Sequence, residues 1–187
     1  MKTIHFSFLI FSIFAFHLQA QVIPIETKNF SLVMTVGKNQ KLYQSYLGKK
    51  LDYGIKELPQ GKHEAYIPSG TDNLFEPAVR ITHSDGNPSL ELLYVNSESK
   101  KDNNVNSTII HLKDPKYPVE VNLHFTTYYN EDIVKSWTEI KHAEKKAVVV
   151  SNYASSMLHF DAGKYWLTQF YGDWAEEMRM EESKLTH

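Results

Sequence analysis

Short stretches in which apolar and polar residues alternate dominate the sequence, and they restrict the fold to β structure. The clearest stretch is residues 119–125, whose odd positions are apolar and whose even positions are polar: Val119, Val121, Leu123 and Phe125 against Glu120, Asn122 and His124. A period of two places alternate side chains on opposite faces of a strand. This pattern predicts a half-buried antiparallel strand with one face toward water.

Further strands are predicted wherever apolar segments lie between turn residues. They cover residues 29–36, 41–47, 77–83, 90–95, 133–141 and 148–150. Gly37-Lys38-Asn39 predicts a hairpin turn, and Asp85-Gly86-Asn87-Pro88 predicts a chain reversal. The polar stretch Asn96–Asn106 predicts a mobile loop, and Val148–Val150 predicts burial on both faces. Turns recurring about every ten residues, without a long helical pattern, favour an all-β fold, an antiparallel β-sandwich.

The stretch Tyr165–Met180 is rich in aromatic residues and ends in a charged segment with two methionines. Its first half alternates with strand period. Gly172 has the backbone freedom for a sharp bend, so we expect a strand, a bend at Gly172, and then a second strand or a short helix. Asp173 and Trp174 would lie at the exposed corner.

The first 20 residues have the pattern of a signal peptide. A lysine at position 2 precedes an apolar run over residues 4–16, and Ala20 is a small residue suited to cleavage before Gln21. The run is short for a membrane span, although an uncleaved amino-terminal anchor is the alternative. We therefore expect an exported protein, periplasmic or secreted, with no membrane association after cleavage, and one domain over residues 21–187.

Charge and cysteine content exclude several classes of function. Removing residues 1–20 moves the formal net charge from −2 to −3, because Lys2 is the only charged residue removed, so the sequence has no basic footprint for nucleic acid. The chain has no cysteine, which excludes disulfides and cysteine metal sites. Its nine histidines are spread singly, without the spacing of a ligand pair. We predict no metal site and no cofactor.

Two motifs resemble the amino-terminal domain of glycoside hydrolase family 36, the bacterial α-galactosidases. Gly172, Trp174, Ala175 and Glu177 match a Gly-x-Trp-Ala-x-Glu signature. The segment Glu76–Val95 is similar to a second run of the family, in which Pro-Ala precedes an Asp-Gly turn and a leucine-rich strand. The resemblance extends from about Asn29 to the end of the chain.

The resemblance implies a β-sandwich of the supersandwich type, followed in the family by a (β/α)₈ barrel. In the family, both catalytic aspartates of the retaining mechanism lie on that barrel, which this chain lacks. We therefore expect the amino-terminal fragment of an exported α-galactosidase, incomplete at its carboxyl end and inactive alone. Expected partners are α-galactoside sugars, the missing barrel, and other copies of the chain in a homo-oligomer. No catalytic residue is assigned within these 187 residues.

Four residues are candidates for sugar contact. The family has an acidic residue in the loop before Pro77, which corresponds to Asp72 or Asn73, and a carboxylate can accept hydrogen bonds from neighbouring hydroxyls. Turn hydrogen bonds are the more common use of both residues. The corner residues Tyr171 and Trp174 would wall the sugar site, since an aromatic face complements a galactose ring. Burial of Trp174 in the core or in a domain interface is the favoured alternative.

Two other functions remain open. The same aromatic residues would suit a non-catalytic secreted carbohydrate-binding or adhesion sandwich, in which the corner Gly172-Asp173-Trp174 faces solvent rather than a barrel. A stand-alone structural protein that forms an oligomer interface is a third reading. A severed domain would expose an apolar patch and associate, whereas a stand-alone domain would remain monodisperse.

Overall fold

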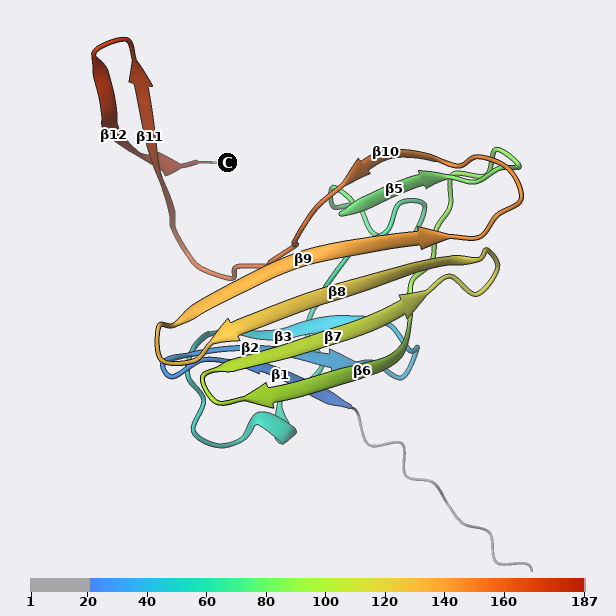
Figure 1. Ribbon diagram of the computed structural model, residues 1–187, viewed down its shortest axis with the longest axis horizontal. Helices are drawn as coiled ribbons and strands as arrows, with labels where there is room; N and C mark the ends of the chain where they lie inside the picture. Colours follow the sequence, from blue (N-terminus) through green and yellow to red (C-terminus); the bar gives the residue numbers. More distant parts are fainter. Residues whose placement is uncertain (1–20, 187) are drawn as a thin grey trace, which may run out of the picture.

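The computed structural model describes residues 21–186, and the proposed signal peptide lies outside these residues. The described chain is all-β, with a single 3₁₀ turn at Ile55–Glu57. Its strands form four antiparallel sheets, two of which have four strands each (Figure 1). In the described part of the chain, no helix is long and apolar enough to cross a membrane.

The first four-stranded sheet has the order β1-β2-β3-β4. Its strands are β1 (Val22–Glu26), β2 (Phe30–Val36), β3 (Leu42–Lys49) and β4 (His63–Glu64). The predicted hairpin between β2 and β3 is confirmed. The Gly37 amide bonds to the Lys41 carbonyl at 2.9 Å, and Gln40 takes the left-handed conformation that closes the turn.

The second four-stranded sheet is a meander with the order β6-β7-β8-β9. It comprises β6 (Leu93–Asp102), β7 (Val105–Lys113), β8 (Val119–Tyr128) and β9 (Ile133–His142). The alternating strand and its predicted partner, β8 and β9, pair antiparallel as expected. Asn122 differs from the prediction, because it is buried on the polar face, where it accepts a hydrogen bond from His111 Nδ1 at 2.7 Å.

The predicted mobile loop at Asn96–Asn106 is wrong. Strand β6 runs through it to Asp102, a tight turn with Asn103 in the left-handed conformation follows, and β7 begins at Val105. The segment is polar because much of β6 is exposed at the edge of the sheet. Backbone pairing to β7 therefore forms the strand without an apolar face.

The two large sheets share one hydrophobic core. Strands β1–β3 contribute Ile23, Ile25, Leu32, Met34 and Leu42, and strands β7 and β8 contribute Ile110, Leu112, Val119, Val121, Leu123 and Phe125. Two antiparallel sheets packed over a common core are consistent with a β-sandwich. Figure 1 shows the sheets as two overlapping layers.

A small sheet of two strands, β5 (Val79–Thr82) and β10 (Val149–Tyr153), lies beside the sandwich. The chain reversal at Asp85-Gly86 is confirmed, with Gly86 in the left-handed region. Residues 90–95 nevertheless do not form one returning strand. Leu90 and Leu92 enter the core before β6 begins.

The predicted burial of Val148–Val150 on both faces is also wrong, because β10 is an edge strand and Val149 is 60% exposed.

The last two strands, β11 (Tyr165–Asp173) and β12 (Glu176–Leu185), form a hairpin that projects away from the sandwich (Figure 1). We call this hairpin the arm. Every residue from 166 to 186 is exposed. The predicted bend at Gly172 is wrong. Gly172 lies within β11, and the turn is made by Trp174 and Ala175, with φ of +64° at Ala175.

Candidate functional site

The loop of residues 70–76 carries the first two candidates and is anchored at its start. The Ser69 amide bonds to the Val79 carbonyl, and the Ser69 carbonyl accepts from the Leu90 amide. Gly70 has φ of +78°, and a Cβ there would lie 2.6 Å from the Ser89 Cα. Glycine is therefore required at the point where the loop leaves the sheet.

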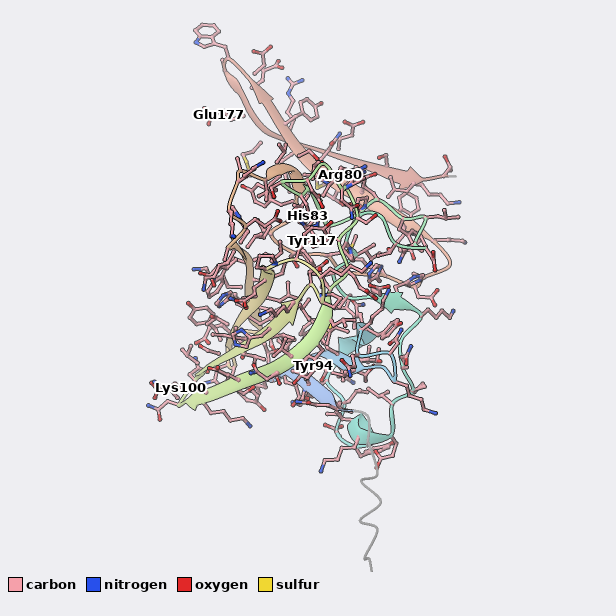
Figure 2. The ribbon with its side chains drawn as sticks, turned by 90° about the vertical axis from the view of Figure 1, so that its right-hand side faces the viewer. Arg80, His83, Tyr94, Lys100, Tyr117 and Glu177 are labelled. Atoms are coloured by element: carbon pink, nitrogen blue, oxygen red, sulfur yellow. The ribbon has the colours of Figure 1, made fainter. Side chains whose placement is uncertain are left out.

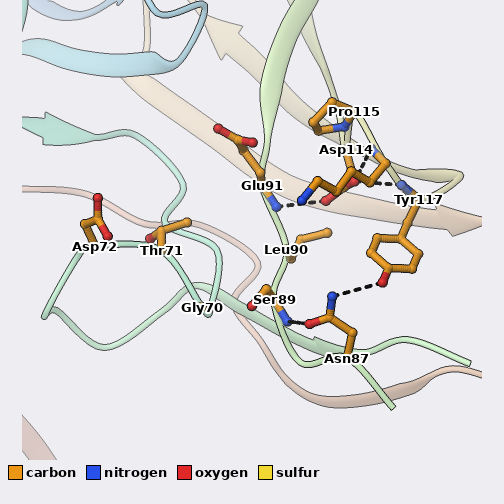
Figure 3. Close-up of a pocket in the computed structure, with 11 residues that line it drawn as sticks. Gly70, Thr71, Asp72, Asn87, Ser89, Leu90, Glu91, Asp114, Pro115 and Tyr117 are labelled. Carbon is orange, nitrogen blue, oxygen red and sulfur yellow. Dashed lines mark hydrogen bonds between the residues drawn. The ribbon is translucent and has the colours of Figure 1, made fainter. Parts of the chain in front are cut away.

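Asp72 and Asn73 have different surroundings in this loop. The Asn73 side-chain oxygen accepts a hydrogen bond from the Phe75 amide at 3.1 Å, which is a local turn contact. Asp72 is exposed and lines a pocket of about 340 Å³ (Figure 3). Its carboxylate is therefore the better placed of the two to accept hydrogen bonds from a ligand in that pocket.

The carboxylates of the other two acidic residues in this pocket differ in how far they are already hydrogen-bonded within the chain. Asp114 Oδ1 accepts the amides of Lys116 and Tyr117 at 2.7 Å each, and Asp114 Oδ2 accepts the Glu91 amide at 2.8 Å. This carboxylate is occupied in shaping the loop. Glu91 is exposed, so Asp72 and Glu91 are the two carboxylates that can face a ligand here (Figure 3).

A buried hydrogen-bonded pair, His83 and Glu144, lies behind the wall of the pocket that Ser89 and Tyr117 form. His83 and Glu144 have side chains 0% and 5% exposed, and His83 Nδ1 donates to Glu144 Oε1 at 2.7 Å. His83 Nε2 lies 3.0 Å from the Ser89 carbonyl, so both ring nitrogens have an oxygen partner. The Tyr117 ring stacks on His83 with centroids 3.5 Å apart (Figure 2).

The Glu144 carboxylate is fully engaged. Its second oxygen accepts the Ser84 amide at 2.9 Å. The hydrogen bond from His83, followed by that from Ser84, lowers the pKa of Glu144 from 4.5 to about 2. The cluster is therefore a positioning element for the wall. Sequence reasoning missed it because Glu144 lies 61 positions from His83 and belongs to no motif.

Tyr171 and Trp174 lie toward the tip of the arm and are exposed by 52% and 93%. The Trp174 amide donates to the Asp173 carboxylate at 2.7 Å, which fixes the backbone at the corner. Burial of Trp174 in the core is therefore wrong for this chain. Tyr171 lines a shallow hollow of about 430 Å³ together with Glu177, which Figure 2 labels on the arm.

Asp72 and the residues of the arm tip line separate hollows, so the chain itself does not bring the two candidate groups together. Within residues 21–186, no group of three or more histidine, cysteine, aspartate and glutamate side chains is arranged to hold a metal ion. The two places offer hydrogen bonding by carboxylates and contact by aromatic rings.

The fold and the candidate site define the class of protein: an antiparallel all-β domain that carries an exposed hairpin rich in aromatic residues. The chain belongs to the glycosyl hydrolase family 36 N-terminal domain family, whose model matches residues 40–187. No curated protein matches the chain in a sequence comparison.

Solved structures of α-galactosidases have the same fold. The galactosidase domain of the α-galactosidase–sucrose kinase AgaSK superposes with a TM-score of 0.77 at 21% identity, over 89% of this chain and 28% of that one. AgaB from Geobacillus stearothermophilus gives 0.76 at 18% identity, over 92% and 28%. An AgaA variant from the same organism, in complex with raffinose, gives 0.77 at 17% identity, over 89% and 28%. The chain thus spans about 28% of the length of the first two structures and of the AgaA variant.

Proposed function

We propose that this chain is the front domain, a β-sandwich of the supersandwich type, of an exported α-galactosidase. The parent enzyme would remove terminal α-galactose from oligosaccharides by a retaining mechanism, with its two catalytic aspartates on a barrel that this chain lacks. Membership of the family supports the proposal, and the similar solved structures include an AgaA variant in complex with raffinose. Residues 1–20 would direct the export.

The observation that carries the proposal is the exposure of the arm. Eight large apolar side chains on it are 45–93% exposed: Trp166, Leu167, Phe170, Tyr171, Trp174, Met178, Met180 and Leu185. A hairpin with so much apolar surface in water is typical of an interaction element. In the parent enzyme the arm would pack against the barrel, and its tip would border the galactose site.

The roles of the candidate residues follow from their chemistry. The Asp72 carboxylate, exposed in its pocket, would accept hydrogen bonds from adjacent hydroxyls of the sugar. The indole of Trp174 would cover the apolar face of the galactose ring, with Tyr171 beside it. Asn73 would hold the loop through its bond to the Phe75 amide. None of these four residues would take part in breaking the glycosidic bond.

Kinetics of the parent enzyme test this proposal. In the protein encoded by the complete reading frame, Trp174→Ala should raise KM for raffinose about three- to tenfold, the loss of one aromatic contact of about 0.5–1.5 kcal/mol, with kcat nearly unchanged. Asp72→Asn should act in the same direction. Tyr53→Ala, at an aromatic residue that is 88% exposed outside the arm, is the matched control. An unchanged KM in both variants, or hydrolysis of an α-galactoside by residues 21–187 alone, would contradict the proposal.

The 93% exposure of Trp174 also favours a second candidate, a non-catalytic sugar-binding domain. In that case the chain alone would bind raffinose through Tyr171 and Trp174. Titration of residues 21–187 with raffinose, followed by the fluorescence of Trp174 against a Trp174→Phe variant, separates the two. Saturable binding at millimolar sugar supports the binding domain, and no binding supports the front domain of an enzyme. Size-exclusion chromatography of the same sample tests the proposed homo-oligomer.

A further inference from the structure

The arm is attached to the sandwich by a specific joint at its base. The side chain of Gln44, which is 9% exposed on β3, contacts the backbone of His159 through both ends of its amide. Its nitrogen donates to the His159 carbonyl at 2.6 Å, and its oxygen accepts the His159 amide at 3.0 Å. These two bonds fix the segment between β10 and β11 against the sheet.

Two stacked histidines continue this joint. His159 Nε2 donates to the Glu64 carbonyl at 2.8 Å, and the His159 ring stacks on the His63 ring with centroids 4.9 Å apart. His63 also makes a T-shaped contact with Phe75, with ring centroids 5.0 Å apart. Phe75 belongs to the loop of residues 70–76. The joint therefore connects the base of the arm with the loop that carries Asp72 and Asn73.

No carboxylate of residues 21–186 that lies near the two histidine rings is placed to compensate a positive charge on them. The Glu64 carboxylate is paired with Lys41 at 2.8 Å. Lys62 and Asp161 are exposed and face each other at 3.5 Å. Tyr46 and Tyr165 line a hollow together with the two histidines, and their hydroxyls donate to the carbonyls of Lys49 and Phe160. Among the described residues, neither ring is hydrogen-bonded to a carboxylate.

We infer that the contact of His63 with His159 is an acid-sensitive joint, which holds the arm and the loop 70–76 in place while the rings are neutral and releases both when they are protonated. Two positive rings in stacking contact repel each other. Burial lowers the pKa of His159, and so does the neighbouring His63, although the hydrogen bond to the Glu64 carbonyl acts in the opposite direction. Because the open joint binds protons more readily, the released state gains population as the pH falls below about 6.5. The inference concerns the motion of the arm and of the loop 70–76, and it does not rest on the proposed function.

Hydrogen exchange of residues 21–187 tests the joint directly. After correction for the intrinsic pH dependence of exchange, protection of the His159 and Phe75 amides, both of which are hydrogen-bonded, should fall about tenfold between about pH 7.5 and pH 5, as for uptake of one linked proton. Protection of β7 and β8 should not change. Equal protection of the joint at both pH values would overturn the inference.

His63→Phe is the matched variant, because phenylalanine keeps the ring between His159 and Phe75 but cannot be protonated. It should retain the protection of the parent chain at pH 7.5 and lose most of the fall at pH 5. The same fall in this variant would overturn the inference. If the variant does not fold, the ring protons of both histidines decide by NMR. Coupled titration supports the joint, and independent titration at ordinary pKa values refutes it. No galactosidase assay enters, so the outcome is independent of the proposed function.

Discussion

Removing the arm should leave the stability of the sandwich almost unchanged. Deletion of residues 166–187 removes no buried side chain from the described part of the chain, because every residue from 166 to 186 is exposed. Tyr165, which donates to the Phe160 carbonyl at the base of the arm, is kept. We expect the free energy of unfolding to change by less than about 0.5 kcal/mol, as for surface changes in general.

The scale for this comparison comes from the core. Ile110 is 0% exposed on β7, and Ile110→Ala should cost about 2–5 kcal/mol through lost burial and the cavity left behind. At about 2–4 °C per kcal/mol for a chain of this size, its Tm should fall by about 4–20 °C. The Tm of the shortened chain should fall by less than about 2 °C on the same scale.

Thermal unfolding followed by circular dichroism measures both values in one series. The shortened chain should also scatter less light at high concentration, because the exposed apolar surface of the arm is gone. If the deletion lowers Tm as far as Ile110→Ala does, the arm must pack on the sandwich. The assignment of the arm as an element for another partner would then be refuted.

Three further predictions concern single residues. Because the pKa of Glu144 is lowered from 4.5 to about 2, its contribution to stability is complete above pH 4.5 and is lost as the pH falls toward 2, so Glu144→Gln should flatten the fall of Tm in that range. Gly61→Ala places a Cβ 1.8 Å from the Gln44 carbonyl oxygen and should lower Tm markedly, whereas Gly163→Ala, with open space around it, should not. Ala175 has a left-handed conformation that costs about 1–2 kcal/mol for a residue with a Cβ, so Ala175→Gly should stabilise the turn and raise hydrogen-exchange protection in the arm.

The strands that sequence predicted well are those with one face in the core. In β8, burial of Val121 and Leu123 between polar neighbours leaves a period of two that can be read without knowing the partner strand. The turn at Gly37 was predictable for a related reason, since this glycine stands between β2 and β3, and the turn at Gly86 was predictable from its Asp-Gly and Asn-Pro pairs. Local chemistry therefore accounts for β8 and β9 of the second sheet and for the β2–β3 hairpin, whereas β7 was not predicted.

Strands held mainly by backbone pairing were not predictable. The polar part of β6 is a strand because β7 pairs with it, a fact that its own side chains do not encode. Val149 and Val150 have strand propensity, but their exposure depends on β10 pairing only with β5, about 70 residues earlier in the chain. Sequence separation of this size hides the partner from any local pattern.

The candidate site was predictable in part. The motifs located Asp72, Asn73, Tyr171 and Trp174 on loops or corners, and all four lie there or near the turn of the arm. The hydrogen bond from the Phe75 amide occupies Asn73 and leaves Asp72 free for a ligand, and the spacing of residues in the sequence does not reveal this bond. The role of these residues in sugar binding stays a prediction.

The amide of Gln44 recognises a peptide unit rather than a side chain, since its two bonds go to the main-chain N–H and C=O of His159. The contact is therefore indifferent to which residue occupies position 159, but it depends on how many residues precede it. Substitutions between β10 and position 159 should leave the two hydrogen bonds of Gln44 intact. An insertion or deletion there would bring a different peptide unit to Gln44 and change the direction in which the arm leaves the sandwich. In evolution, the length of this linker should therefore be conserved more strictly than its composition.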